Sequence, residues 1–173
     1  MVLRALSIRE ELVRALRAMA AAGLVQGTEG NASARAGELV AISPTGLAYE
    51  SLRPEDVALV GPDGTFVEGS APSVELPMHL AVLAARPDVG AVVHTHSRHA
   101  TARPTVPVAE GRSGTVELGS AVVAALGGGD AVVIRAHGPV SVGRDLAAAL
   151  ARAIELEEEA WSYPERSGSR PSR

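Results

Sequence analysis

The sequence predicts an α/β domain in which helices alternate with short strands. Three observations lead to this prediction. Apolar residues recur at helical intervals in several segments, short β-branched runs lie between turns that contain glycine or proline, and no repeat or linker divides the 173 residues. A chain of this length can bury a core without cross-links. We therefore expect a single domain over residues 1–163, followed by a polar tail over residues 164–173.

The first expected element is an amphipathic helix that begins near Ser7. Leu12 and Leu16 are four residues apart, which places them on the same face of a helix. Ser7 and Glu10 have the spacing of a capping box, in which the two side chains satisfy backbone amides at a helix start. Gly23 is typical of a helix end.

The elements that follow alternate between strands and helices. Residues 31–43 predict a hairpin that turns at Ala36-Gly37, and the turn "PDG" separates two further short strands, "DVALV" and "TFVEG". A helix that begins near Ser73 should end before Pro87, because the residue before proline disfavours the α conformation. The remaining elements are expected to be a strand, a loop rich in proline and glycine, a helix, two strands and a last helix, over about 89–96, 103–114, 116–126, 130–143 and 145–161.

Two absences limit the chemistry that this chain can perform. It contains no cysteine, which excludes disulfides, thiolate nucleophiles and cysteine-ligated zinc. It contains no lysine, which excludes Schiff-base and P-loop mechanisms. The net charge of −4 argues against a nucleic-acid surface, and the longest conspicuous uncharged run is too short to span a membrane. The N-terminus also lacks an apolar signal core, so we expect a cytoplasmic protein with no nucleic-acid or membrane partner.

The segment "AVVHTHSRHA" places two histidines one residue apart at the end of a β-branched run. On a strand, side chains at i and i+2 leave the same face, so His94 and His96 should point the same way. His137 follows another β-branched run, and two neighbouring strands would bring the three imidazoles together. Three histidines with one free coordination position form an open catalytic metal site. The alternative is that these histidines only hydrogen-bond to loops at the strand ends.

The other two histidines have simpler interpretations. His79 falls within the helix expected after Ser73, where we expect a packing or hydrogen-bonding residue. His99 comes three residues after His96 and is a weaker candidate ligand. The chain has no H-E-x-x-H segment, so the helical zinc-protease arrangement is missing.

Four segments together resemble the class II aldolase/adducin family, typified by L-fuculose-phosphate aldolase. The most distinctive is "PSVELPMHLAVLAARPDVGAVVHTHSRHATA". "EGNASAR" is similar to the family's G-N-[IFL]-S motif, "ISPTGLAYESLRPEDVALV" to its stretch with T-G and P-E-D, and "IRAHGPVSVGRDLAAALARAIELEEEA" to its third-histidine strand and terminal helix. The likeness extends from about Glu10 to Ala160. It implies a three-layer α/β/α fold with a central, mainly antiparallel sheet.

The resemblance also implies roles for individual residues. It makes His94, His96 and His137 the ligands of Zn²⁺ or another divalent metal, and it makes Glu75 the catalytic acid/base. A further set would cradle a substrate phosphate: Gly30, Asn31, Thr45, Gly46 and Ser73. Each residue of this set has a structural alternative, such as a turn glycine or a helix cap.

A metal ion held in this way acts as a Lewis acid toward a ketone with an adjacent hydroxyl group, so an aldolase without lysine is feasible. Glu75 would move the proton at carbon, and we expect burial to raise its pKa toward neutrality. The chain also departs from the family's aldolases. Val74 replaces a serine, and no tyrosine lies between Thr101 and His137, where those enzymes carry the tyrosine that protonates the leaving fragment. Tyr163 is the only aromatic acid/base candidate near the C-terminal end.

Three functions are compatible with this pattern. The first is a zinc-dependent aldolase that acts on a small ketose phosphate or a related hydroxyketone. The second uses the same metal and fold as a sugar-phosphate dehydratase, epimerase or decarboxylase. The third is an adducin-like assembly module without catalysis, although a scaffold has no need of Glu75 together with three histidines. The resemblance further implies a homotetramer with active sites at subunit interfaces.

Overall fold

The computed structural model describes residues 3–162. Its helices are α1 (Leu6–Ala21), α2 (Leu76–Ala85), α3 (Arg98–Ala102), α4 (Val116–Leu126) and α5 (Leu146–Ser162), with a short 3-10 helix η1 (Pro54–Asp56). Its strands are β1 (Asn31–Ala36), β2 (Leu39–Ile42), β3 (Ala58–Val60), β4 (Phe66–Glu68), β5 (Ala91–His94), β6 (Val108–Ala109), β7 (Ala131–Ile134) and β8 (Gly138–Gly143).

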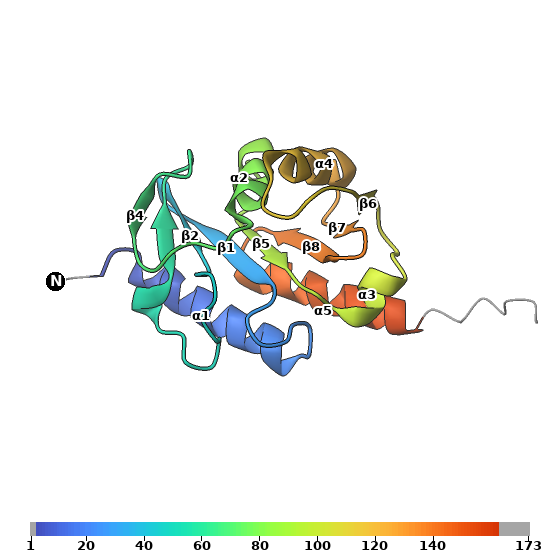
Figure 1. Ribbon diagram of the computed structural model, residues 1–173, viewed down its shortest axis with the longest axis horizontal. Helices are drawn as coiled ribbons and strands as arrows, with labels where there is room; N and C mark the ends of the chain where they lie inside the picture. Colours follow the sequence, from blue (N-terminus) through green and yellow to red (C-terminus); the bar gives the residue numbers. More distant parts are fainter. Residues whose placement is uncertain (1–2, 163–173) are drawn as a thin grey trace, which may run out of the picture.

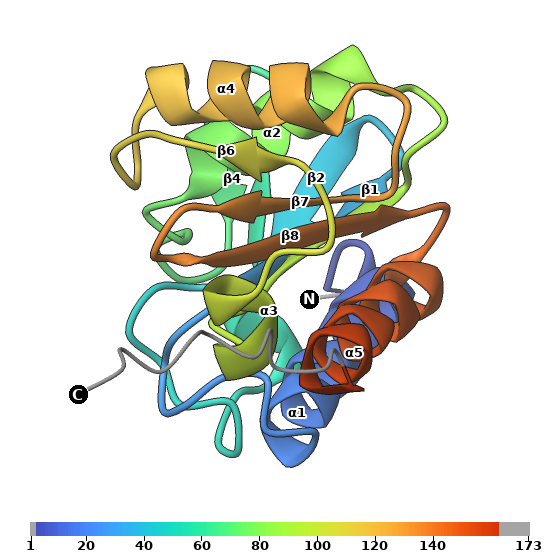
Figure 2. The same ribbon diagram turned by 90° about the vertical axis from the view of Figure 1, so that its right-hand side faces the viewer.

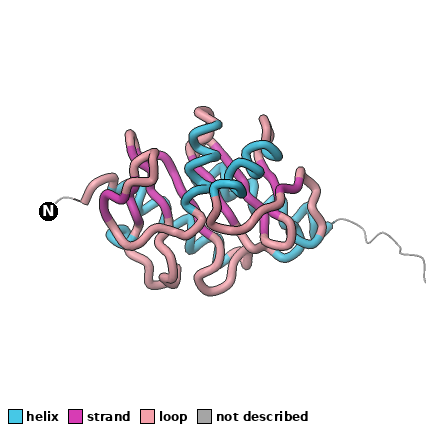
Figure 3. Tube along the Cα trace, turned by 45° about the horizontal axis from the view of Figure 1, so that its top comes forward, coloured by secondary structure: helices cyan, strands magenta, loops and turns pink. Residues whose placement is uncertain are grey.

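The elements form three layers, with one sheet between two layers of helices. The eight strands lie in the order β4-β3-β2-β1-β5-β8-β7-β6, and every neighbouring pair is antiparallel except β6 and β7. Helices α1 and α5 cover one face of the sheet, and α2 and α4 cover the other (Figures 1 and 2). Figure 3 shows the strands running between helices on both sides. The predicted three-layer α/β/α fold with a mainly antiparallel sheet is therefore confirmed.

Each face of the sheet has its own apolar core. Leu12 and Leu16 of α1 pack with Ala149 of α5 against one face, and Met78 of α2 packs with Leu118 of α4 against the other. All five side chains are almost completely buried. Burial of a leucine or methionine side chain contributes roughly 1.5–3 kcal/mol, so these two cores hold the helices firmly against the sheet.

The first helix begins within one residue of its predicted start, but its capping box is absent, and the second helix begins three residues later than predicted. Helix α1 begins at Leu6, after Ala5 in a left-handed conformation, and the Ser7 hydroxyl donates to Glu11 instead of forming a capping box with Glu10. Helix α2 begins at Leu76, because the backbone before it is held in an extended bridge between Pro44 and Pro72. Its predicted end at Ala85 is confirmed.

The region after β5 contains more regular structure than the sequence predicts. Strand β5 ends at His94, so His96 lies beyond the strand and is followed by the short helix α3. Two residues of the expected loop over 103–114 form β6, which pairs with β7. The expected helices over 116–126 and 145–161 are present as α4 and α5.

The neighbouring ends of β1 and β5, in the middle of the sheet, position the candidate site. Asn31 at the start of β1 lies opposite His94 at the end of β5, and His94 lies opposite Val140 of β8. No helix in residues 3–162 is long and apolar enough to cross a membrane. Tyr163 and the predicted tail over 164–173 lie outside the described residues.

Candidate metal centre and adjoining cavities

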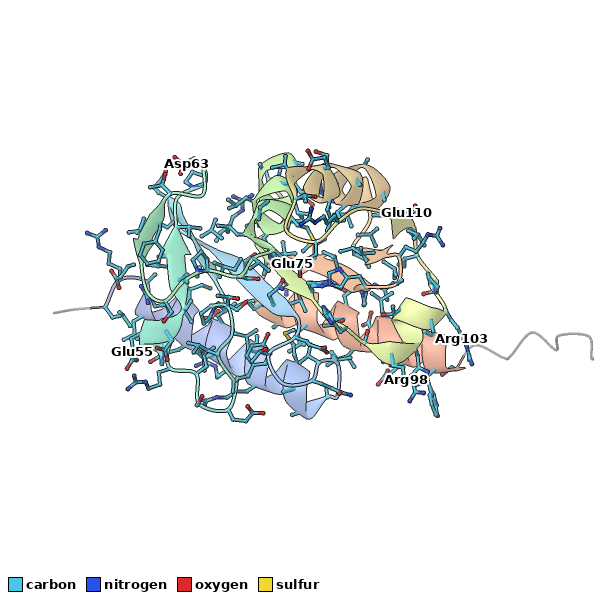
Figure 4. All side chains as sticks on the ribbon, viewed as in Figure 1. Glu55, Asp63, Glu75, Arg98, Arg103 and Glu110 are labelled. Carbon is cyan, nitrogen blue, oxygen red and sulfur yellow. The ribbon has the colours of Figure 1, made fainter. Side chains whose placement is uncertain are left out.

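Four of the predicted site residues meet at these strand ends. Glu75, His94, His96 and His137 each offer one ligand atom, and these four atoms lie within 4.8 Å of one another. The ring centroids of the three histidines are 4.7 to 5.1 Å apart. Figure 4 shows Glu75 near the middle of the molecule, beside the start of α2. The structure thus brings together residues that are up to 62 positions apart in the sequence.

His94 presents a buried nitrogen that has no hydrogen to donate. Its Nδ1 atom lies 3.0 Å from the carbonyl oxygen of Pro139, which can only accept, so Nδ1 carries the proton. Burial lowers the pKa of His94, so the ring is neutral and Nε2 is a bare acceptor. Nε2 has no hydrogen-bond partner and faces Oε2 of Glu75 at 3.1 Å. The three imidazoles could hold a divalent cation beside this carboxylate, and they are a donor set that zinc and similar ions accept.

Glu75 occupies the position just before α2 without making a capping hydrogen bond, and its carboxylate is almost completely buried. Oε2 accepts a 2.8 Å hydrogen bond from Nδ2 of Asn31, and Oε1 accepts one of 2.6 Å from the hydroxyl of Ser113. Burial alone raises the pKa of Glu75, but the hydrogen bonds from Asn31 and Ser113 stabilise the charged form, and the pKa lies below its ordinary value. The expected rise toward neutrality is therefore wrong. Glu75 is a carboxylate at neutral pH and can accept a proton.

His137 lies in the turn between β7 and β8, which places it in the cluster. A Cβ atom on Gly138 would lie 1.9 Å from the carbonyl oxygen of Thr95, so only glycine lets this turn lie directly against the end of β5. Ala136 has a φ of 55°, a left-handed conformation that costs about 1 kcal/mol for a residue with a side chain. This local geometry holds Nε2 of His137 3.8 Å from Oε1 of Glu75.

The predicted phosphate-binding residues line one small polar cavity next to the cluster. Its volume is about 170 Å³, and its walls include Gly30, Asn31, Thr45, Gly46 and Ser73. Within residues 3–162, the backbone amides of Gly46 and Val74 have no hydrogen-bond acceptor, and both residues line the cavity. No arginine lines it, so its donors are neutral.

Three members of this set also have structural roles. Gly30 has a φ of 70°, and a Cβ atom there would lie 2.7 Å from the carbonyl oxygen of His94. Asn31 uses its amide oxygen and one amide hydrogen inside the protein, because Oδ1 contacts His79 and Nδ2 donates to Glu75. Ser73 is not the cap of α2, but its hydroxyl accepts from the Glu75 amide at 3.2 Å.

A larger cavity of about 620 Å³ shares Glu29, His96 and His137 with the small one. Its other walls include Val25, Gln26, Arg98 and Thr101. Oε2 of Glu29 lies 3.6 Å from Nδ1 of His96, and Arg98 has no ion-pair partner in the part of the chain that the structure describes. Figure 4 shows Arg98 at α3. The cluster therefore opens on two cavities of different size and charge.

The sequence reasoning missed two residues that contact the cluster. Glu29 directly precedes the glycine and asparagine of the "EGNASAR" motif, and this position is the signal that could have identified it. Ser113 reaches Glu75 from the loop before α4, and nothing in its sequence surroundings indicates that contact.

The other two histidines lie outside the cluster. His99 packs edge-on against Trp161 at 4.6 Å between ring centroids, with Nε2 3.9 Å from Glu157, and is not among the four clustered residues. His79 is completely buried in α2 and hydrogen-bonded through both ring nitrogens. Its interpretation as a packing or hydrogen-bonding residue is confirmed.

Comparisons with known proteins agree with this geometry. The family model for the class II aldolase and adducin N-terminal domain matches residues 10–104 and 102–163. The 5-methylthioribulose-1-phosphate/5-deoxyribulose-1-phosphate aldolase of Rhodospirillum rubrum is 38% identical over an alignment of 178 positions that covers 91% of this chain and 80% of the relative. The L-fuculose phosphate aldolase of Escherichia coli is 36% identical over an alignment of 161 positions that covers 82% of this chain and 75% of the relative.

A solved structure extends the likeness to three dimensions. YgbL of Escherichia coli, described as a candidate aldolase, epimerase or decarboxylase, superimposes with a TM-score of 0.87 at 29% identity. The superposition covers 98% of this chain and 93% of YgbL. Fold and layer order are therefore shared over almost the whole of both chains.

Proposed function

The chain belongs to the class II aldolase and adducin family, and we propose that it is a divalent-metal-dependent aldolase acting on a small ketose phosphate or a related hydroxyketone. One observation carries this proposal. The bare Nε2 atom of His94 faces Oε2 of Glu75 at 3.1 Å in a buried cluster that His96 and His137 complete. Such a cluster has a clear use in metal-assisted chemistry and none in packing.

In this proposal the three histidines hold the ion and Glu75 stays beside it as the acid/base. Zn²⁺ suits the imidazole ligands, although other divalent ions accept the same donors. When bound, the ion supplies Lewis-acid polarisation of the substrate carbonyl and stabilises the negative charge that develops there. The remaining tasks fall to side chains of the chain itself.

The two cavities suggest where the two halves of a substrate lie. The small cavity offers neutral donors to a phosphate group, among them the free amides of Gly46 and Val74. Replacement of a serine by valine at position 74 removes a hydroxyl group but keeps this amide. The larger cavity would receive the part of the substrate that leaves as an aldehyde, with Arg98 available to polar or anionic groups on it.

Glu75 and Glu29 are placed to move the two protons of an aldol reaction. In the condensing direction, the Glu75 carboxylate removes a proton from the carbon beside the ketone, and that carbon then attacks the aldehyde. The new alkoxide oxygen takes a proton through Glu29, which lines both cavities next to His96. Cleavage runs the same steps in reverse. Glu29 thus takes the role for which no tyrosine is available between positions 101 and 137.

A panel of ketose phosphates and unphosphorylated hydroxyketones tests this function on the metal-loaded protein. We expect cleavage of a ketose 1-phosphate to an aldehyde and a three-carbon ketone phosphate, followed by NMR, and condensation of the same products. A panel in which no member is cleaved or condensed would refute the aldolase proposal.

The same panel separates the second candidate function. The missing tyrosine favours a reaction without an aldehyde leaving group, so a dehydratase, epimerase or decarboxylase is the alternative. NMR would then show loss of water, inversion at one carbon or release of carbon dioxide in place of two fragments. A non-catalytic, adducin-like assembly role predicts no conversion and no proton exchange at carbon for any compound.

A further inference from the structure

We propose that His79 is a positioning residue that holds the Glu75 carboxylate in place through Asn31. This inference rests on the proposed acid/base role of Glu75. It concerns a histidine that lies outside the metal cluster and that the proposed mechanism does not otherwise use.

Two residue pairs face each other between β1 and α2. Asn31 and Ser33 are two residues apart on β1, so their side chains leave the same face of the sheet. Glu75 and His79 are four residues apart at the start of α2, so they lie on the same face of that helix. All four side chains are buried, and each contacts one or two of the others.

The hydrogen bonds between these four residues can run in only one direction. The Glu75 carboxylate accepts, so Nδ2 of Asn31 donates to it at 2.8 Å. Oδ1 of Asn31 must then accept, so Nε2 of His79 carries a proton and donates at 2.5 Å. Nδ1 of the neutral ring is left as an acceptor for the hydroxyl of Ser33 at 2.7 Å. Burial lowers the pKa of His79 to about 4, which keeps the ring neutral at working pH.

The consequence is that His79 anchors the Asn31 amide. Without a donor at Oδ1, this buried amide oxygen loses its partner, and the Asn31 side chain can move away from Glu75. Oε2 of Glu75 receives the Asn31 hydrogen bond and is also the atom that faces His94. His79 therefore helps to hold Oε2 of Glu75, the oxygen that faces His94, through two consecutive hydrogen bonds.

Substitution at position 79 tests this inference on the metal-loaded protein. His79→Leu removes both hydrogen bonds at similar volume, whereas His79→Gln keeps an amide that can donate to Asn31. We expect kcat of His79→Leu to fall by about 10 to 100-fold with KM and metal content nearly unchanged, as for other residues that orient a ligand or base. His79→Gln should recover most of the loss. His99→Leu is the matched control and should behave like the parent.

Two further measurements keep the test decisive. Should His79→Leu fail to fold, Ser33→Ala removes only the hydroxyl that donates to Nδ1 of His79. In that variant kcat should fall about 2 to 10-fold, the usual effect of one hydrogen bond. An equal kcat in the parent, His79→Leu and Ser33→Ala would overturn the inference, as would a His79→Gln variant no better than His79→Leu.

The tautomer itself gives a readout that needs no activity. With only five histidines in the chain, nitrogen NMR of histidine-labelled protein can be assigned by comparison with His79→Gln. We expect a protonated Nε2 and an unprotonated Nδ1 on His79. A protonated Nδ1 would overturn the inference whatever the enzyme does. Failure of the proposed function would instead show as an inactive parent, with the tautomer as expected.

Discussion

His94 and Glu75 bring two buried hydrogen-bond acceptors, Nε2 and Oε2, to within 3.1 Å of each other. The Pro139 carbonyl fixes the His94 tautomer, and the hydrogen bond from Asn31 holds the carboxylate, so neither group can turn away without losing a partner. Two acceptors that face each other in a low-dielectric interior repel each other, and this repulsion destabilises the fold. A cation held by His94 beside this carboxylate would replace the repulsion by attraction, so its binding should be favourable.

The first prediction is therefore a divalent ion in the cluster, about one per chain, as in open catalytic zinc sites. A double variant, His94→Ala with His96→Ala, should lose the ion because two of three imidazole ligands are gone. Elemental analysis of the purified proteins measures this. His99→Ala is the control and should keep the metal, whereas an unchanged metal content in the double variant would rule out this site.

The second prediction concerns the proton at carbon. Glu75→Gln preserves shape and leaves the three histidines, so the variant should fold and retain most of its metal. Activity should fall by about 10² to 10⁴, the usual contribution of a positioned acid/base. Exchange of deuterium from solvent into a bound hydroxyketone should fall equally. A variant that exchanges as fast as the parent would show that Glu75 is not the proton carrier.

The third prediction separates the two carboxylates. Glu29→Gln should slow cleavage by about 10² or more, because the hydroxyl proton loses its carrier. Deuterium exchange into the three-carbon ketone phosphate should continue at the parental rate, since that step needs only Glu75. Glu38→Gln, at the exposed turn between β1 and β2, is the matched control. Loss of both activities in Glu29→Gln would contradict the assignment.

The sequence predicted most helices and strands because their signals are local. The apolar spacing of α1, the proline after α2 and the alternating hairpin of β1 and β2 each depend on a few neighbouring residues. Where a local signal failed, a competing interaction decided the result. Ser7 has the spacing of a capping box, yet α1 begins one residue before it.

The site was predictable only in part, because its contacts join distant segments. His94 and His96 are neighbours in the sequence, and His137 was added by its similar surroundings. The hydrogen bonds of Asn31 and Ser113 to Glu75 cross 44 and 38 positions, and no periodicity encodes them. These two bonds are also among the reasons that the pKa of Glu75 moves down, where burial alone would have moved it up.

The fourth prediction is a homotetramer. Val74, which lines the small cavity, and Val116 at the start of α4 are 67% and 68% exposed, so both present apolar surface to solvent. A partner subunit that covers these side chains would also exclude water from the cluster. Light scattering should give four times the chain mass of 17.7 kDa. A monomer with full activity would contradict this assembly.

The last prediction follows from the buried ring of His79. Its pKa is about 4 in the folded protein, because burial disfavours the charged form, and about 6.5 in the unfolded chain. Between these values the unfolded chain binds the proton and the folded protein does not, so the free energy of unfolding decreases as the pH falls. Between pH 7 and pH 5 this group should remove about 2 kcal/mol. Urea unfolding at both pH values, with a metal chelator present, measures this change. The free energy of unfolding should decrease more in the parent than in His79→Gln. Equal decreases would mean that His79 is already charged in the folded protein.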